Sequence, residues 1–336
     1  SAPLPYGRGS DHVKSTANDG NALAFDLKQH LTAKQKLVDQ RLAETLQRET
    51  AAPAILVEAM RYSLLAPGKR LRPALVYMAA QAAGGNDDCA WPAACAVEMI
   101  HTYSLIHDDL PAMDDDDLRR GVPTCHKKYG EALAILAGDG LLTLAFQVLA
   151  EHYPPRTAAA CCLELARGSG AAGMVGGQVD DLAWERANDR ERAIKDPLFP
   201  QGQRPHTLEA LENIHQYKTG ALFRACLKLG VHAAQGERGV DDELLNRLET
   251  FGRCFGLVFQ ITDDLIDVEG NAADTGKAVG KDAARGKLTY PGLLGVSESR
   301  QRARGLTQQA IDAVRPIGAG AEPLIALMHF VLDRDR

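Results

Sequence analysis

The chain has 336 residues, of which 45% are hydrophobic and 24% are charged, and its formal net charge at pH 7 is -6. This composition is typical of a globular protein and excludes a disordered or fibrous chain. Because nucleic-acid binding requires a basic surface, the acidic balance also argues against a nucleic-acid partner.

The sequence predicts a protein without a membrane span. It has no continuous apolar run of roughly 18 to 20 residues, the length that a span needs, and its N-terminal segment lacks the basic-then-apolar order of a signal peptide. The seven cysteines are scattered, with no Cys-x-x-Cys pair that would suggest zinc or redox chemistry. Reduced thiols in the cytoplasm are the simplest interpretation.

The predicted elements begin after a leader. Residues 1–25 are rich in Ser, Gly, Pro and Asn, so we expect them to be flexible. Stretches rich in Ala, Leu, Glu, Gln and Arg then recur, which predicts an all-α fold. Residues 188–206 carry three prolines and several charges and are expected to be an exposed loop, too short for a domain boundary, so residues 26–336 are predicted to be one helical domain. Breaks between helices are predicted at Ala66–Gly68, Gly84–Asn86, Gly121–Pro123, Tyr153–Pro155 and Gln235–Glu237.

A first acidic cluster lies in the segment His101–Gly121. An apolar helical stretch there ends in six aspartates followed by two arginines. Adjacent carboxylates repel one another, so the cluster is either a solvated helix end or is held near cations. The segment alone leaves both interpretations open.

A second acidic cluster lies in the apolar helical segment Phe255–Val268. Asp263 and Asp267 are four residues apart and share one helix face. Like charges at this spacing destabilise a helix, and an apolar context increases the cost unless a cation compensates. Oxygen ligands without nearby His or Cys favour a hard cation, and carboxylates that leave room for phosphate oxygens suit Mg2+.

Basic residues beside glycines, aspartates or helix boundaries form a third pattern. A surface position is the more common explanation for any one of them. Together with two carboxylate clusters, however, they indicate a site for diphosphate, which Arg and Lys neutralise while Mg2+ bridges it to Asp. These residues are Lys69, Arg72, Arg119, Arg120, Lys218, Lys277 and Lys287.

Five motifs occur in order along the chain: GKRLRP at Gly68–Pro73, the aspartate-rich Asp108–Asp114, GMVGGQ at Gly173–Gln178, KTG at Lys218–Gly220 and FQITDDLID at Phe259–Asp267. Together they resemble the bacterial-type farnesyl diphosphate synthases of the trans-prenyltransferase family. The resemblance implies an all-α fold of about ten core helices around a deep central cavity, usually in a homodimer. It also implies a reaction, the condensation of isopentenyl diphosphate with dimethylallyl diphosphate and then geranyl diphosphate to give (2E,6E)-farnesyl diphosphate.

The resemblance implies a metal cluster. Carried over by position, Asp108, Asp114 and Asp263 hold three Mg2+ ions on the allylic diphosphate, with Mn2+ as a substitute, and Asp109 and Asp267 support them. The metal and basic residues then stabilise the departing diphosphate, so that the allylic bond ionises to a carbocation that isopentenyl diphosphate attacks.

The remaining roles also come from the resemblance. The allylic diphosphate is gripped by Arg119, Lys218, Lys277 and Lys287. The isopentenyl diphosphate site is formed by Lys69, Arg72, His101 and Arg120. Oxygens of Lys218, Thr219 and Gln260 lie near the carbocation and stabilise it.

Product length is assigned to Tyr103, with the small Ser104 beside it. Tyr103 lies five residues before Asp108, roughly 7 to 8 Å along a helix, near the depth that a growing chain must pass. The alternative is that Tyr103 is an ordinary core aromatic, since it lies about 140° around the helix from Asp108. In the family, an aromatic here together with two extra motif residues, Pro111 and Ala112, accompanies a fifteen-carbon product.

Alternatives remain. A geranylgeranyl or geranyl diphosphate synthase of the same family would carry the same motifs. A terpene cyclase binds one diphosphate, so the second basic set argues against it, and a non-catalytic regulatory subunit typically lacks an aspartate motif. Gly173, Gly176 and Gly177 are interpreted as packing glycines rather than ligands.

Overall fold

The computed structural model of the protein describes residues 25–188, 206–269 and 287–334, and within them regular structure is almost entirely helical. This confirms the all-α prediction. The elements in chain order are α1 (Leu27–Arg48), α2 (Ala54–Leu64), α3 (Leu71–Ala82), α4 (Asp87–Asp108), β1 (Leu118–Arg119), β2 (Val122–Pro123), α5 (Cys125–Tyr129), α6 (Glu131–His152), α7 (Pro155–Ser169), α8 (Met174–Asn188), α10 (Leu208–His215), the π-helix η1 (Gln216–Gly220), α11 (Ala221–Gln235), α12 (Asp242–Glu269), α15 (Tyr290–Leu294), α16 (Val296–Val314), the 3-10 helix η2 (Arg315–Ala321) and α17 (Glu322–Leu332).

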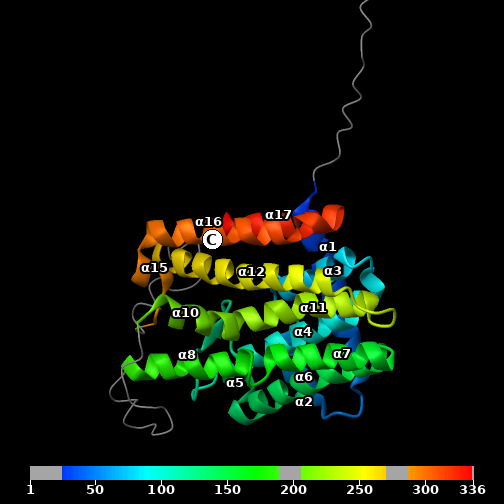
Figure 1. Cartoon of the computed structure of the whole chain (residues 1–336). Coiled ribbons are helices and arrows are strands. Elements are labelled where there is room, and N and C mark those ends of the chain that lie inside the picture. Colours follow the sequence, from blue (N-terminus) through cyan, green and yellow to red (C-terminus); the bar gives the residue numbers. More distant parts are fainter. Residues whose placement is uncertain (1–24, 189–205, 270–286, 335–336) are drawn as a thin grey trace, which may run out of the picture.

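The long helices lie side by side in stacked layers (Figure 1). From the top of the view, α16 and α17 are followed by α12, then by α10 and α11, then by α7 and α8, with α6 and α2 below. Buried apolar side chains from Val38 in α1 to Val331 in α17 form one contiguous cluster between these layers. Burial of this apolar surface is the main force that holds the helices together.

Helix boundaries follow local side-chain chemistry. Asn86 begins α4 by accepting a 3.0 Å hydrogen bond from the amide of Cys89, and Thr289 begins α15 in the same way through the amide of Gly292. All five predicted breaks fall at boundaries between helices. One of them, Gly121–Pro123, is more than a break, because it belongs to an antiparallel hairpin of β1 and β2 that we did not predict.

α4 lies at the centre of the packing and contacts α1, α2, α3, α6, α7 and α11. Its residues from Pro92 to Ile100 are all buried, so this part of the helix is enclosed on every face, and Glu98 is its one charged member. Elsewhere, helices approach one another closely where one of them has a glycine. A Cβ at Gly177 in α8 would lie 2.1 Å from the backbone nitrogen of Lys218 in η1, which confirms the interpretation of a packing glycine.

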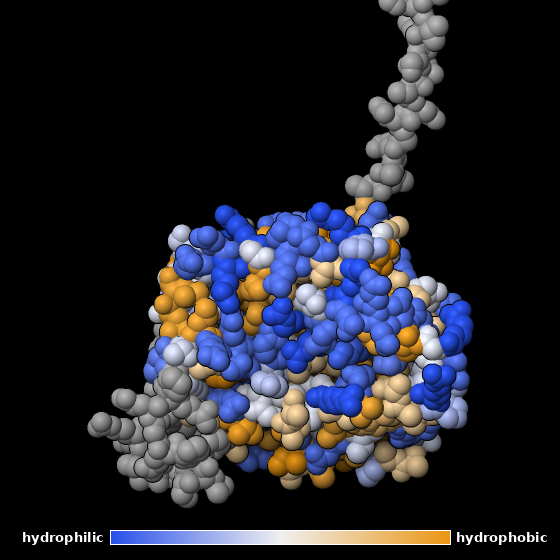
Figure 2. Space-filling model, viewed as in Figure 1, coloured by the Kyte–Doolittle hydropathy of each residue, from blue (hydrophilic) through white to orange (hydrophobic). Residues whose placement is uncertain are grey.

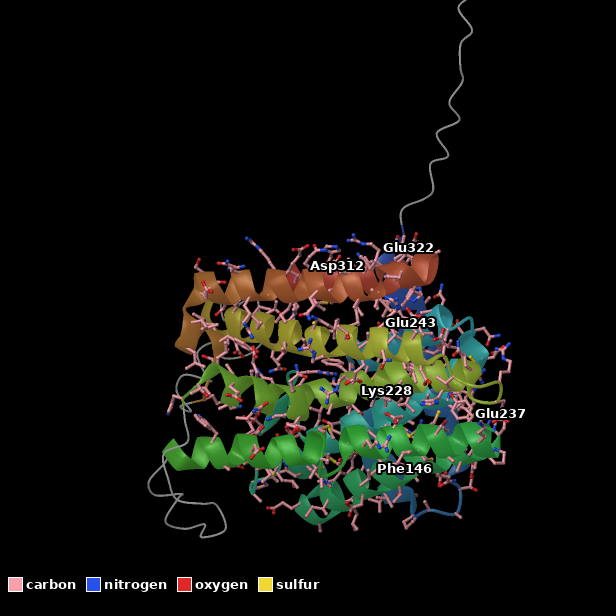
Figure 3. The ribbon with its side chains drawn as sticks, viewed as in Figure 1. Phe146, Lys228, Glu237, Glu243, Asp312 and Glu322 are labelled. Carbon is pink, nitrogen blue, oxygen red and sulfur yellow. The ribbon has the colours of Figure 1, made fainter. Side chains whose placement is uncertain are left out.

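Ion pairs join neighbouring layers. Lys228 on α11 lies between α7 and α12 (Figure 3), and its Nζ is 3.6 Å from Glu164 and 3.0 Å from Glu249. At the end of the molecule, Glu237 accepts hydrogen bonds from the amide and hydroxyl of Thr157 at 3.1 and 2.9 Å. This contact ties the start of α7 to the end of α11.

Polar side chains cover most of the face shown in Figure 2, with apolar patches at its edges. One described helix, α6, is long and apolar enough to cross a membrane, with a mean hydropathy of 1.8 and 44% of its most apolar stretch buried. This is weak evidence for a span, because a core helix meets the same criterion.

Three predictions fall wholly or partly outside the described residues. The leader 1–25 does so except for Phe25, whose ring lies 5.2 Å from that of His30. The loop 188–206 is described only at its two ends, and Lys277 is not described.

Candidate functional site

The first aspartate cluster lies at the C-terminal end of α4. Asp108 is the last residue of the helix, and its carbonyl oxygen accepts a 2.9 Å hydrogen bond from the amide of Asp114, which folds the loop back onto the helix end. Burial raises the pKa of Asp108 to about 6, although Lys218 and Arg119 oppose the shift. The protein's own cations therefore compensate this carboxylate only in part.

Asp109, predicted as a supporting metal ligand, contacts Arg119. The carboxylate is 2% exposed and accepts from Arg119 Nη2 at 2.6 Å and from Nε at 2.8 and 2.9 Å. Burial raises the pKa of Asp109, with the charge of Arg119 acting against it. Arg119 was predicted to grip diphosphate, and in this structure it neutralises the buried aspartate.

The β1–β2 hairpin positions Arg120. Arg120 and Gly121 form its two-residue turn with φ angles of 53° and 80°, as a type I′ turn requires. The Arg120 guanidinium donates a hydrogen bond to the carbonyl of Pro67, and a Cβ at Gly68 would lie 2.4 Å from its Nη1. The hairpin thus brings Arg120 to the loop that precedes α3.

That loop also carries Lys69, Arg70 and Arg72. Lys69 is exposed, whereas Arg70 turns inward and pairs with Glu98 and Asp39, each at 2.7 Å. Arg70 adopts a left-handed φ of 47°, an unusual conformation for a non-glycine residue, and anchors the loop. The motif GKRLRP therefore contains one structural arginine between two candidate ligands.

Arg72 on α3 and His101 on α4 are close enough for the charge of the arginine to act on the imidazole. The Arg72 guanidinium lies 4.7 Å from the centre of the Phe223 ring, and its Nε is buried without a hydrogen-bond partner among the described residues. Burial lowers the pKa of His101 well below its usual value, and the charges of Arg72 and Arg120 lower it further. The structure therefore brings these three predicted residues together, with a neutral imidazole among the arginines.

The second aspartate cluster lies near the end of α12. Asp264 points into the core, where it accepts a 2.9 Å hydrogen bond from the amide of Tyr290 and so holds α15. Asp263 is exposed, and Asp267 and Gln260 are half-buried on the same helix. Burial lowers the pKa of Arg72, and the charge of Asp263 is among those that oppose this shift, which places the second cluster within electrostatic reach of α3.

Arg334, which was not predicted as a site residue, binds the second aspartate cluster. This residue follows α17 and donates to Asp263 Oδ1 at 2.6 Å, to the carbonyl of Phe259 at 2.6 Å and to Thr262 Oγ1 at 2.8 Å. Its guanidinium also lies 4.1 Å from the centre of the Phe259 ring. No local pattern in the sequence indicates a role for Arg334, because its partner Asp263 lies 71 residues away in the chain.

The KTG motif forms the π-helix η1, a rare conformation often found at functional sites. Lys218 pairs with Asp181 of α8, and Asp108 and Lys287 also act on its pKa. Burial would lower the pKa of Lys218, but the carboxylates raise it above its usual value, so the lysine stays charged. Thr219 is buried beside it.

The aspartate clusters offer carboxylate oxygens as potential metal ligands. The charge-dense end of α4 fits a hard cation, because Asp108 is half-buried and only partly neutralised. The predicted carboxylates of Asp108, Asp109, Asp114, Asp263 and Asp267 do not form a set of three whose atoms lie within 4.8 Å of one another. Among the described residues, the group that does so is Asp115, Asp117 and His126, which were not predicted as metal ligands.

Residues 53–316 match the family model described as polyprenyl synthetase. The farnesyl diphosphate synthase of Escherichia coli is 42% identical over 319 residues, which cover 93% of this chain and 100% of that protein. Geranylgeranyl pyrophosphate synthase 9, chloroplastic, of Arabidopsis thaliana is 43% identical over 323 residues, covering 95% of this chain and 84% of that protein.

Solved structures agree. An apo FPP/GFPP synthase from Zymomonas mobilis superposes with a TM-score of 0.76 at 36% identity, covering 91% of this chain and 98% of the other. A geranyltransferase from Legionella pneumophila superposes with a TM-score of 0.77 at 33% identity, covering 92% and 97%. The fold is therefore the isoprenoid synthase fold, and the chain belongs to the polyprenyl synthetase family of prenyltransferases.

Proposed function

We propose that the protein condenses isopentenyl diphosphate with dimethylallyl and then geranyl diphosphate, and that it releases (2E,6E)-farnesyl diphosphate. The observation that carries the proposal is the convergence of two acidic and two basic segments. The charge of Lys218 in η1 acts on Asp108 at the end of α4, and the charge of Asp263 in α12 acts on Arg72 in α3.

The metal would be Mg2+, held by Asp108, Asp114 and Asp263 with support from Asp109 and Asp267. When bound, it would neutralise the allylic diphosphate and make it a better leaving group. Asp263 now binds Arg334, so this arginine must move or share the carboxylate when a cation arrives. Three ions per site and replacement by Mn2+ belong to the proposal.

The allylic diphosphate would lie against Lys218, Lys287 and Arg119. Lys218 is suited to this role because Asp181 orients it and keeps it protonated despite its burial. Arg119 keeps guanidinium surface available, since its side chain is 30% exposed although it binds Asp109. Lys277 is assigned here by its motif alone.

The isopentenyl diphosphate would lie against Arg72, Arg120, Lys69 and His101. The buried Nε of Arg72 has no partner among the described residues, and a phosphate oxygen is the kind of acceptor that it lacks. His101 is expected to act as a neutral hydrogen-bond donor, because its lowered pKa prevents protonation near pH 7.

The chain's own groups then direct the chemistry. As the allylic carbon–oxygen bond breaks, oxygens of Lys218, Thr219 and Gln260 stabilise the carbocation as fixed dipoles. The double bond of isopentenyl diphosphate attacks the cation, and a proton is lost to the departed diphosphate. The burial of Thr219 limits water that would otherwise capture the cation.

Product length rests on Tyr103. The residue is 7% exposed on α4, and its ring packs edge-on against His107 at 5.7 Å. His107 is itself held against α6, where a ring nitrogen lies 3.1 Å from the carbonyl of Ile135 and a Cβ at Gly138 would clash with the ring at 2.2 Å. This packing supports the proposed role of the Tyr103 ring as a floor, and Ser104 is small, so that Tyr103 would act largely alone.

The test is the product distribution of Tyr103→Ala. With dimethylallyl and labelled isopentenyl diphosphate, the parent is expected to stop at fifteen carbons and the variant to make geranylgeranyl diphosphate first and then longer chains. Tyr103→Phe keeps the ring and serves as the control, for which farnesyl diphosphate is expected. Unchanged products from an active Tyr103→Ala variant would place the floor elsewhere.

A second candidate is geranylgeranyl diphosphate synthesis. It is favoured by the 43% identity to a protein named geranylgeranyl pyrophosphate synthase, close to the 42% shared with the farnesyl diphosphate synthase. The parent protein decides between the two in the same assay, because a twenty-carbon main product would select this candidate.

We also propose that the protein works as a homodimer of one helical domain, residues 26–336, in the cytoplasm. The support for a dimer is α6, whose Ile135 and Leu136 are 43% and 55% exposed. Burying the exposed half of such side chains against a second copy is favourable by roughly 1 kcal/mol each. Leu136→Asp is expected to shift the sedimentation coefficient to that of a monomer, and an unchanged coefficient would exclude α6 from the interface.

A further inference from the structure

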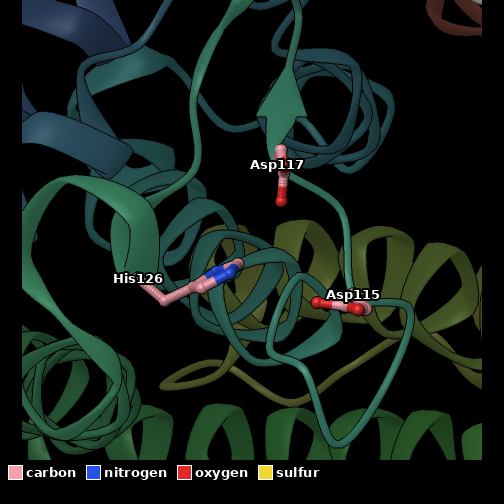
Figure 4. A group of neighbouring side chains, drawn as sticks. All are labelled: Asp115, Asp117 and His126. Carbon is pink, nitrogen blue, oxygen red and sulfur yellow. The ribbon is translucent and has the colours of Figure 1, made fainter.

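Three potential metal ligands lie beside the site without belonging to it. Atoms of Asp115, Asp117 and His126 all lie within 4.8 Å of one another (Figure 4). They come from the loop after Asp114, from the residue before β1 and from α5. In the picture the imidazole points into the space between the two aspartates.

His126 is the buried member of this group. The residue is only 5% exposed. Its ring nitrogen Nε2 is buried and has no hydrogen-bond partner among the described residues. An unpartnered buried nitrogen is costly, which points to a ligand that the protein itself does not supply.

The other ring nitrogen shows which form of the imidazole is present. Nδ1 lies 3.1 Å from Thr124 Oγ1, whose hydroxyl donates to the carbonyl of Asp116 at 3.0 Å. Because the hydroxyl proton is used in that bond, Oγ1 accepts from Nδ1–H, and the lone pair is left on Nε2. A histidine that donates through one nitrogen and offers the other is the arrangement found in metal sites.

The two carboxylates complete a mixed ligand set. Asp115 and Asp117 are exposed, and Asp117 pairs with Lys127 at 2.7 Å. Ligand atoms around a tetrahedral ion with bonds of about 2.0 to 2.2 Å lie roughly 3.4 Å apart. To bind an ion, the exposed carboxylates therefore need to move slightly closer to the imidazole. Lys127 competes with the ion for Asp117.

We propose that Asp115, Asp117 and His126 form a second cation site, which takes Zn2+ or a similar borderline transition metal. An imidazole nitrogen beside two carboxylates suits Zn2+, whereas Mg2+ prefers oxygen ligands alone. A bound ion would tie α5 to the loop and to the start of β1. It would thereby hold the hairpin that presents Arg120, independently of what that hairpin binds.

The test is calorimetric titration of the metal-depleted full chain with Zn2+ in saturating Mg2+, so that oxygen-only sites are already filled. One site is expected in the parent. Asp115→Asn and Asp117→Asn are expected to weaken it at least tenfold, while Lys127→Ala, which frees Asp117, is expected to tighten it. Asp116→Asn, which removes the same charge from the same run, is the control and is expected to bind as the parent does.

Hydrogen exchange provides a second readout. Zn2+ is expected to slow amide exchange in residues 115–126 of the parent but not of Asp115→Asn. The carboxylate variants carry the test because His126→Asn could disturb the core. Zn2+ binding that survives both Asp115→Asn and Asp117→Asn, as binding by cysteines would, overturns the assignment, and so does the absence of binding in the parent.

Discussion

The buried pair of Asp109 and Arg119 gives the sharpest test of the site's electrostatics. Arg119→Met keeps much of the side-chain length but removes the three contacts of 2.6 to 2.9 Å that neutralise a carboxylate only 2% exposed. Breaking a buried pair from one side destabilises a protein by about 3 to 5 kcal/mol. Because Arg119 is 30% exposed and water can enter in its place, we expect the lower end, about 3 kcal/mol.

The loss should depend on pH in a defined direction. Burial raises the pKa of Asp109, so its contribution to stability is fully present below the ordinary pKa of an aspartate, about 3.9, and is lost as pH rises through the folded-state value. Without Arg119 the folded-state pKa rises further. The deficit of the variant relative to the parent is therefore small in acid and grows towards neutral pH.

The measurement is urea unfolding at pH 5 and pH 8 in the presence of EDTA. Asp109→Asn and the double variant complete a double-mutant cycle, which isolates the interaction energy between Asp109 and Arg119. Arg156→Met, at an exposed position in α7, is the control and is expected to change the free energy of unfolding by no more than about 0.5 kcal/mol. A loss for Arg119→Met below about 1 kcal/mol, or an equal loss at both pH values, would refute the reasoning.

Further predictions concern the reacting centre. Because burial raises the pKa of Asp108 to about 6, its charge opposes folding above that pH, and Asp108→Asn should raise the Tm of the metal-free protein at pH 8; a lower Tm would contradict this. Asp108→Ala and Asp263→Ala should each lose most turnover while remaining folded by circular dichroism, and near-normal turnover at saturating Mg2+ would exclude the metal assignment. Arg120→Ala should raise the KM for isopentenyl diphosphate, and Lys218→Ala the KM for the allylic substrate, by roughly ten- to a hundredfold. Equal effects on both substrates would argue against two separate diphosphate sites.

The sequence alone determined the class of fold and the motifs of the site. Helix formation depends on neighbours three and four residues away, so composition and periodicity were sufficient to predict α4 and α12 and the breaks around them. Local chemistry also showed that Asp263 and Asp267 share a face of α12. The hairpin at Gly121 was missed, because Arg-Gly is not a strong signal for the turn that it forms.

The tertiary structure decided which charges meet. Asp109 pairs with Arg119, Lys218 with Asp181 of another helix, and Arg334 with an aspartate 71 residues away. The motifs gave these residues a common chemistry but no partners, because the partner of a charged side chain depends on how distant helices pack. Burial has the same origin: desolvation raises the pKa of Asp108 only once the end of α4 is enclosed by elements that lie far from it in the chain.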